Sequence, residues 1–204
     1  MMIPARLFAA LYDWMLKGSE EAGLHEKRGA LLRDASGRTL EIGAGTGLNM
    51  DLYPDAARPL VLTEPEEPMA RRLRERAGSR AEVVDAGADR LPFEDDSFDT
   101  VVSTLVLCTV PDQAAALREI RRVLKPGGRL LFLEHVRSDA SGTAKWQDRL
   151  TPVWRFMGRG CHPNRDTAAA MRSAGYEFER LDQDRLPKAP PIVRPMIAGI
   201  ARPA

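Results

Sequence analysis

The chain has 204 residues, 44% of them hydrophobic and 29% charged, a composition typical of one soluble globular domain. Its 30 lysines and arginines against 29 aspartates and glutamates leave a net charge of +1. Because proteins that bind duplexes neutralise phosphates with a basic surplus, this balance argues against nucleic acid as the main partner. The two cysteines have no close-spaced partner, so the sequence indicates neither a disulfide framework nor a cysteine zinc cluster.

The N-terminal segment, residues 2–16, is apolar but is interrupted by Arg6 and Asp13. It is too short to span a bilayer, and no small-residue cleavage site follows a long apolar run. Four large apolar residues recur in it at helical spacing: Leu7, Leu11, Trp14 and Met15. This spacing predicts an amphipathic helix packed against its own domain. We expect a cytoplasmic protein without stable membrane insertion, and peripheral contact with a membrane stays open as the alternative.

From residue 38 onward, short apolar strands alternate with helical segments. We predict strands over residues 38–42, 60–64, 81–84, 99–107, 129–135, 176–181 and 195–201. Helices are expected from about residue 68 and over residues 113–124, 143–158 and 166–174. This alternation implies parallel strands, right-handed crossovers and helices on both faces. The predicted fold is an α/β, doubly wound, mostly parallel sheet in a single domain, residues 1–204.

A glycine-rich loop follows the first predicted strand. Glu41, Gly43, Gly45 and Gly47 form an E-x-G-x-G-x-G pattern, and Glu64 ends the second strand. Glycine allows a sharp turn and close approach of a ligand to the backbone, and ligands of such sheets bind at the carboxyl ends of the strands. A carboxylate there can accept hydrogen bonds from both hydroxyls of a ribose. The pattern predicts a nucleoside-containing cofactor, and a turn whose glycines only ease packing is the alternative.

Two further segments narrow the choice of cofactor. The glycine spacing differs from the G-x-G-x-x-G fingerprint of dinucleotide sites and resembles motif I of class I S-adenosylmethionine-dependent methyltransferases. Residues 91–99 (LPFEDDSFD) and 117–128 (LREIRRVLKPGG) are similar to two other segments of this family, in the same order. The resemblance covers about residues 38–135. It implies a Rossmann-like sheet of seven strands under an N-terminal helical cover, with S-adenosylmethionine as cofactor.

The resemblance assigns three parts to the chain. Residues 1–35 are the N-terminal helices, residues 36–136 the cofactor-binding core, and residues 137–204 the substrate-side helices with the final strand pair. Glu41, Gly43, Gly45 and Gly47 are expected around the methionine portion of the cofactor, and Glu64 at the ribose. Ala88 is expected at the adenine, Leu105 near the sulfur, and Tyr12 above the cofactor. The family's usual aspartate near the adenine is Gly87 here, so Asp85, Asp89 or the Ala88 backbone must take its place.

Residues 103–108 (STLVLC) and 134–136 (EHV), with later positions, resemble the methyltransferase-like thiol S-methyltransferases. The later positions are Trp146, Trp154, Gly160, Cys161 and Arg165. The same core also resembles quinone-biosynthesis C-methyltransferases and bacterial phospholipid N-methyltransferases. The resemblance therefore implies methyl transfer to a small hydrophobic acceptor, with a thiol favoured over an amine or a carbon acid.

The candidates for contact with the acceptor are Cys108, Glu134 and His135. Cys108 is interpreted either as a participant or as a buried apolar residue, and His135 either as a proton acceptor or as a structural histidine. No metal is predicted, because the adjacent Cys161 and His162 make a poor chelate. Trp146, Trp154, Phe156 and Met157 form either an apolar lid or part of the core, with the core favoured.

A thiolate is already a strong nucleophile and needs little help from a base. The shortage of strong base candidates therefore favours a thiol or an amine as acceptor. Two hypotheses from other classes are a nicotinamide-dependent oxidoreductase and a catalytically silent cofactor-binding subunit. The glycine spacing and the Lys125–Gly128 segment argue against the first. The intact glycine loop argues against the second.

Overall fold

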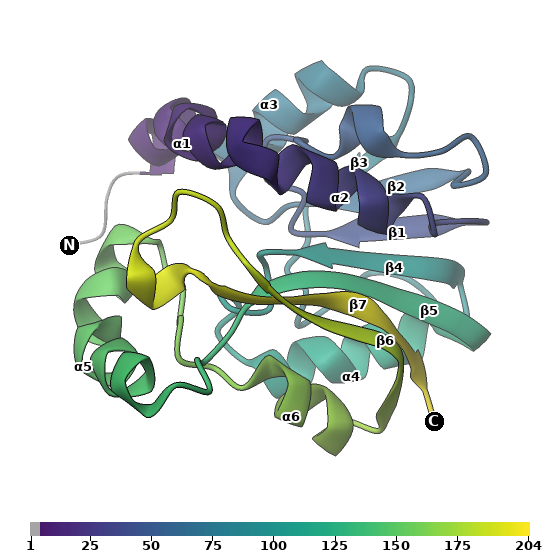
Figure 1. Ribbon diagram of the computed structural model, residues 1–204. Helices are drawn as coiled ribbons and strands as arrows, with labels where there is room; N and C mark the ends of the chain where they lie inside the picture. Colours follow the sequence, from purple (N-terminus) through teal and green to yellow (C-terminus); the bar gives the residue numbers. More distant parts are fainter. Residues whose placement is uncertain (1–4) are drawn as a thin grey trace.

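The computed structural model describes residues 5–204, so residues 2–4 of the N-terminal segment lie outside the described residues. Seven strands form one sheet in the order β3-β2-β1-β4-β5-β7-β6 (Figure 1). The strands are β1 Thr39–Ile42, β2 Leu60–Thr63, β3 Glu82–Val84, β4 Phe98–Thr104, β5 Leu124–His135, β6 Tyr176–Arg185 and β7 Pro195–Pro203. β1 to β5 pair in parallel, and β7 lies antiparallel between β5 and β6. The predicted doubly wound, mostly parallel sheet is confirmed.

Six α-helices connect or flank the strands within the described residues. They are α1 Ala5–Ser19, α2 His25–Leu32, α3 Glu67–Ala77, α4 Gln113–Val123, α5 Ser141–Met157 and α6 Thr167–Ser173. Short turns of 3-10 helix cover Met50–Leu52 and Pro191–Val193, and a π-turn at Glu20–Leu24 joins α1 to α2. Figure 1 shows α2 and α3 on one face of the sheet and α4 and α6 on the other. No helix within residues 5–204 is long and apolar enough to cross a membrane.

The two faces of the sheet carry separate apolar clusters because strand side chains alternate in direction. Val101 and Phe132 belong to the cluster that includes Ile120 of α4. Val102 and Leu131, their neighbours in sequence, belong to the cluster that includes Leu32 of α2. β4 and β5 are therefore buried on both sides, which explains their nearly continuous apolar sequences.

Local signals place the ends of α4. The Asp112 side chain accepts a hydrogen bond from the Ala115 amide and caps the helix. α4 ends at Val123, and β5 begins at once with Leu124, five residues before its predicted start. Leu124 pairs with Phe98 and Arg129 pairs with Thr100, so a bulge absorbs the Pro-Gly-Gly segment within the strand.

The side of α1 that faces the domain differs from the predicted one. The predicted inward-facing residues Leu7, Leu11, Trp14 and Met15 are 41–74% exposed. Asp13, on another side of the helix, accepts hydrogen bonds from Thr46 and from Arg76. The side of α1 that faces the domain therefore carries Asp13 together with Ala9 and Tyr12, and the stripe of Leu7, Leu11, Trp14 and Met15 faces outward.

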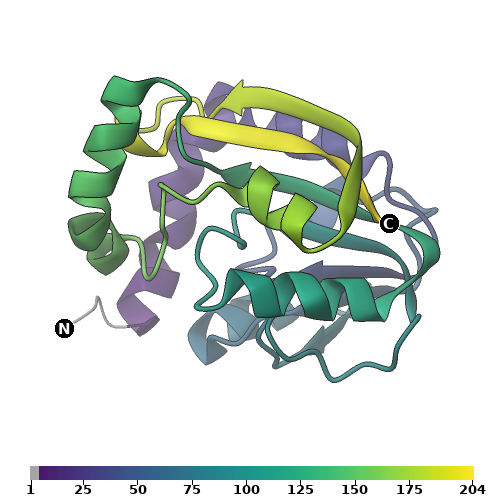
Figure 2. The same cartoon turned by 90° about the horizontal axis from the view of Figure 1, so that it is seen from below.

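The packing of α5 also differs from the favoured interpretation. Trp146, Phe156 and Met157 are 46–56% exposed, whereas Trp154 is partly buried. Gln147 is the buried anchor of this helix: its side-chain amide donates to the carbonyls of Val136, Pro163 and Ile192. The interpretation of the first three as core residues is therefore wrong, because a glutamine occupies the inward position. Figures 1 and 2 place α1 and α5 together at the end of the molecule where β4 and β5 finish.

Candidate functional site

The glycine loop follows β1 at the carboxyl end of the parallel strands. Gly43, Gly45 and Gly47 have φ angles of 55°, 60° and 84°, a region that residues with a Cβ rarely adopt. A Cβ on Gly43 would lie 2.8 Å from side-chain carbons of Val106, in the turn after β4. A Cβ on Gly45 would lie 3.8 Å from the Tyr12 ring of α1. The loop is therefore held closely between the β4 turn and the N-terminal helix.

Glu64 follows β2 and reaches the glycine loop. One carboxylate oxygen accepts from the Gly45 amide at 2.9 Å, and the other accepts from the Glu66 amide at 2.9 Å. Burial raises the pKa of Glu64, and the two amides oppose this shift. The structure thus brings together the two features that the sequence singled out, the loop and the acidic residue after the second strand.

Glu41 lies below the loop within a buried polar cluster. Its carboxylate accepts from the Asn49 amide at 2.8 Å and from the Tyr53 hydroxyl at 2.7 Å. Burial raises the pKa of Glu41 to about 7. Arg28 of α2 completes the cluster, donating to the Asn49 side-chain oxygen at 3.1 Å and to the Thr104 hydroxyl at 3.0 Å.

Sequence reasoning missed four members of this cluster: Arg28, Asn49, Tyr53 and Thr104. They come from α2, from the segment after the loop and from β4, and only Thr104 stands in a segment that the resemblance covers, residues 103–108. A small cavity of about 10 Å³, room for about one water molecule, lies where the cluster meets the loop. Its lining includes Arg28, Glu41, Gly45 and, from above, Tyr12. A buried cation and a buried carboxylate thus face the same space beside the glycines.

The end of β4 carries a second unusual backbone position. Leu105 has a φ of 61°, a conformation that is uncommon for residues other than glycine and often marks a functional turn. Its amide donates to the Leu133 carbonyl at 2.7 Å, which fixes the turn against β5. Ala88, after β3, is buried in the main apolar cluster. The roles predicted for Leu105 and Ala88 in cofactor binding stay predictions.

Glu134 is fully buried in β5 and fixes the turn after β4. One of its oxygens accepts from the Ser103 hydroxyl at 2.6 Å and from the Val106 amide at 3.1 Å. The other oxygen accepts from the Cys108 amide at 3.3 Å. Both oxygens are thus engaged in holding the backbone, and this geometry favours a positioning role over direct proton transfer.

His135, the next residue, points to the other face of the sheet. Burial lowers its pKa to about 4, against a smaller opposing effect of the Val193 backbone. Its Nδ1 atom is buried and has no hydrogen-bond partner within residues 5–204. A neutral imidazole with so low a pKa is a weak proton acceptor.

Cys108, in the turn after β4, meets Cys161, in the segment after α5. Their sulfur atoms lie 3.8 Å apart, and both thiols are free. The sequence indicated no close-spaced partner for either cysteine, since the contact joins the β4 turn to the segment after α5. Within residues 5–204, no group of three histidine, cysteine, aspartate or glutamate side chains is arranged to hold a metal ion.

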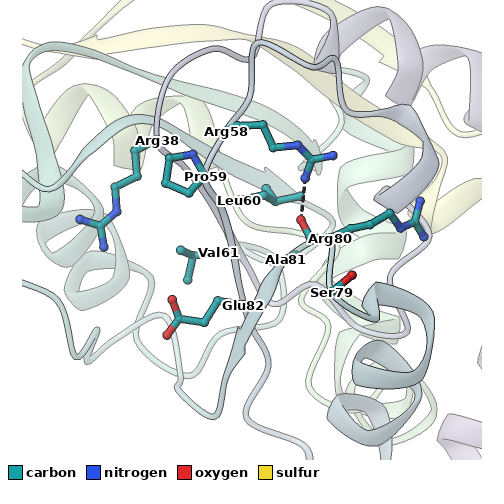
Figure 3. Close-up of a pocket in the computed structure, with 9 residues that line it drawn as sticks. All are labelled: Arg38, Arg58, Pro59, Leu60, Val61, Ser79, Arg80, Ala81 and Glu82. Atoms are coloured by element: carbon teal, nitrogen blue, oxygen red, sulfur yellow. Dashed lines mark hydrogen bonds between the residues drawn. The ribbon is translucent and has the colours of Figure 1, made fainter.

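A separate cavity of about 460 Å³ lies at the amino ends of β1, β2 and β3 (Figure 3). It is lined by Arg38, Arg58, Arg80 and Glu82, among others, and Arg58 donates to the Arg80 carbonyl at 2.6 Å. Because the strands are parallel, this cavity is at the opposite end of the sheet from the glycine loop. None of the predicted site residues lines it.

Comparisons with known proteins agree with this geometry. The sequence profile of a methyltransferase domain matches residues 40–132. The human thiol S-methyltransferase TMT1A is 37% identical over 169 residues, which cover 79% of this chain and 69% of that protein. The ubiquinone/menaquinone biosynthesis C-methyltransferase UbiE of Escherichia coli is 31% identical over 203 residues, which cover 83% of this chain and 79% of that protein.

A solved structure shows the same fold. The crystal structure of an S-adenosylmethionine-dependent methyltransferase from Thermotoga maritima, a possible histamine N-methyltransferase, has a TM-score of 0.74 and 22% sequence identity. The match covers 98% of this chain and 97% of that one. The strand order of the present chain, its glycine loop and these relatives together show that it belongs to the class I S-adenosylmethionine-dependent methyltransferases.

Proposed function

We propose that the protein transfers the methyl group of S-adenosylmethionine to the sulfur of a small hydrophobic thiol. The observation that carries this proposal is the weakness of the bases around the acceptor side. Glu134 uses both carboxylate oxygens on the β4 turn, and the pKa of His135 is about 4. A thiolate acceptor needs orientation more than a base. The 37% identity to a thiol S-methyltransferase supports the same choice.

The residues around the glycine loop fit the cofactor. When bound, S-adenosylmethionine supplies an electrophilic methyl group on a sulfonium. Glu41 and Arg28 line one small cavity with opposite charges, as the ammonium and carboxylate of a methionyl group require. Glu64 is expected to accept from the ribose hydroxyls, since its carboxylate already lies against the loop backbone.

The remaining predicted contacts cover the cofactor from other sides. Ala88 is expected at the adenine and Leu105 near the sulfur, at the carboxyl ends of β3 and β4. Tyr12 is expected to cover the cofactor, because its ring lies over Gly45 and closes a cavity of only about 10 Å³. A ligand the size of a nucleoside therefore requires α1 and the loop to separate when it enters.

Glu41 predicts a pH dependence of cofactor affinity. Its pKa of about 7 means that the carboxylate loses its proton as the pH rises through neutrality, and only the ionised form attracts an ammonium. We expect affinity for S-adenosylhomocysteine to rise between about pH 5.5 and 7.5, where the ligand's amino group stays mainly protonated. Glu41→Gln should remove this pH dependence and weaken binding about tenfold or more at the upper pH, as for a lost charge-assisted hydrogen bond.

Calorimetric titration across this pH range tests the prediction. The matched control is Glu26→Gln, which changes an exposed carboxylate of the neighbouring helix α2 and should bind like the wild type. Equal pH profiles for Glu41→Gln and the wild type would contradict a role of the Glu41 carboxylate at the ammonium group.

The surface around the site supports a hydrophobic acceptor. Trp14 and Met15 of α1, with Phe156 and Met157 of α5, are exposed large apolar side chains. Figure 2 shows the two helices at the same end of the molecule. The cation of Arg159, after α5, lies 5.6 Å from the Phe8 ring of α1 and joins the two helices. An apolar ligand would meet matching surface there. Peripheral membrane contact and a cytoplasmic location stay predictions of the sequence.

The experiment compares three acceptors that share a benzene ring and differ in the group to be methylated. Phenylmethanethiol, benzylamine and cresol are each incubated with S-adenosylmethionine and a non-thiol reductant, and the products are identified by mass spectrometry. We expect the methyl thioether as the main product, formed together with S-adenosylhomocysteine. Methylation of the amine or of the phenol ring, with the thiol unchanged, would overturn the thiol assignment and favour an N- or C-methyltransferase.

A further inference from the structure

The two cysteines of the chain form a pair that methyl transfer does not require. Cys108 lies in the turn after β4, and Cys161 lies between α5 and α6. Their sulfur atoms are 3.8 Å apart. A disulfide has an S–S distance of about 2.05 Å, so forming the bond requires the two sulfur atoms to approach by about 1.8 Å.

Hydrogen bonds hold the two segments together around this pair. The His162 amide donates to the Cys108 carbonyl at 2.8 Å. The Arg165 guanidinium donates to the Leu107 carbonyl at 2.8 Å. The Cys108 amide is in turn fixed by Glu134. Hydrogen bonds therefore fix both the turn that carries Cys108 and the segment that carries Cys161, and this keeps the two thiols close together.

The two thiols have different surroundings. Cys161 keeps 7% of its surface exposed, whereas Cys108 keeps 1%, so a reagent meets Cys161 first. The contact with Cys108 lowers the pKa of Cys161, as do the Trp154 side chain and the Arg165 charge, while burial and the Glu134 charge oppose this shift. The hydrogen bond with Cys161 and burial raise the pKa of Cys108. Cys161, the more exposed thiol and the one with the lowered pKa, is therefore placed to attack a disulfide, and Cys108 is placed to attack the resulting mixed disulfide.

We propose that Cys161 and Cys108 form a thiol–disulfide exchange site for small organic disulfides. The Cys161 thiolate attacks one sulfur of the disulfide, forms a mixed disulfide and releases the first thiolate, which takes the proton of Cys108. The Cys108 thiolate then attacks the Cys161 sulfur, forms the Cys108–Cys161 disulfide and releases the second thiolate, which takes from the solvent the proton that Cys161 gave up at the start. Two electrons pass from the protein to the small disulfide. The released thiols belong to the class of the proposed acceptor, and this link alone rests on the proposed function.

The test uses the full chain, reduced with a phosphine that is then removed, and hydroxyethyl disulfide as probe. Intact mass spectrometry should show that the wild type loses two hydrogen atoms, retains no adduct and releases two equivalents of mercaptoethanol. Cys108→Ser should keep one mercaptoethanol adduct, located on Cys161 by peptide mapping. Cys161→Ser should react at least about tenfold more slowly, because its remaining thiol, Cys108, is the less exposed of the two and burial raises its pKa.

Denatured samples serve as the control for folding and intrinsic reactivity. In strong denaturant both single variants should take up the adduct at similar rates, since the difference in environment is lost. The proposal is overturned if the folded wild type does not react, if it keeps a stable adduct without forming the disulfide, or if folded Cys161→Ser reacts as fast as Cys108→Ser. None of these measurements uses S-adenosylmethionine, so failure here and failure of the methyl-transfer proposal are distinguishable.

Discussion

Glu64→Ala is expected to weaken binding of S-adenosylhomocysteine about 100-fold or more. The carboxylate lies at the carboxyl end of β2, buried beside the glycine loop, where we place the ribose hydroxyls. Hydrogen bonds to a charged group contribute about 1.5–3 kcal/mol each, and two of them account for a loss of this size. The substitution also removes the acceptor of the Gly45 amide, which loosens the loop itself.

Two matched variants separate these contributions. Glu64→Gln keeps one acceptor oxygen in nearly the same shape and should show an intermediate loss. Glu67→Ala removes a carboxylate that is mostly exposed at the start of α3 and should bind like the wild type. Calorimetric titration measures all three variants, and wild-type affinity in Glu64→Ala would contradict the placement of the ribose.

Glu134→Ala is expected to lower the free energy of unfolding by about 3–5 kcal/mol. The wild-type carboxylate is fully buried and accepts from Ser103, Val106 and Cys108. Each buried donor left without a partner costs about 1–3 kcal/mol, and alanine can replace none of the contacts. The β4 turn lies between the glycine loop and the cysteine pair, so loss of its anchor should also reduce methyl transfer.

Glu134→Gln distinguishes anchoring from proton transfer. Its side-chain carbonyl can still accept from Ser103 and Val106, so we expect a smaller loss of stability and a measurable rate. If Glu134 only positions the turn, the pH profile of the remaining activity should match that of the wild type. A rate near the uncatalysed level in a variant that stays folded would instead support the carboxylate as a base. Urea denaturation supplies the stability, with Glu177→Gln, at an exposed position in β6, as control.

The sheet could be predicted from the sequence because its signals are local. Continuous apolar runs marked β4 and β5, and the apolar spacing over residues 113–124 marked α4, which ends one residue earlier than predicted. Each signal acts within a few residues, so its effect does not depend on the rest of the fold. The glycine loop and Glu64 were recognisable for a related reason: each stands at the end of a strand, and the strand ends converge in a parallel sheet.

The rotations of α1 and α5 could not be predicted in this way. An amphipathic pattern shows which residues share a side of a helix, but partners elsewhere decide which side faces the domain. Asp13 is held by Arg76, and Gln147 is held by carbonyls from three segments. Both contacts join residues far apart in the sequence, so the spacing of apolar residues within one helix does not reveal them. Similarly, Arg28 joins the glycine-loop cluster through partners 21 and 76 residues away.

The most direct test of the cofactor site is calorimetric titration of the purified chain with S-adenosylhomocysteine and, separately, with NADH. The glycine loop, Glu41 and Glu64 predict that one S-adenosylhomocysteine binds per chain and that NADH neither binds nor competes. Binding of NADH at the same site, or failure of S-adenosylhomocysteine to bind to the folded chain, would contradict the assignment of these residues to the cofactor.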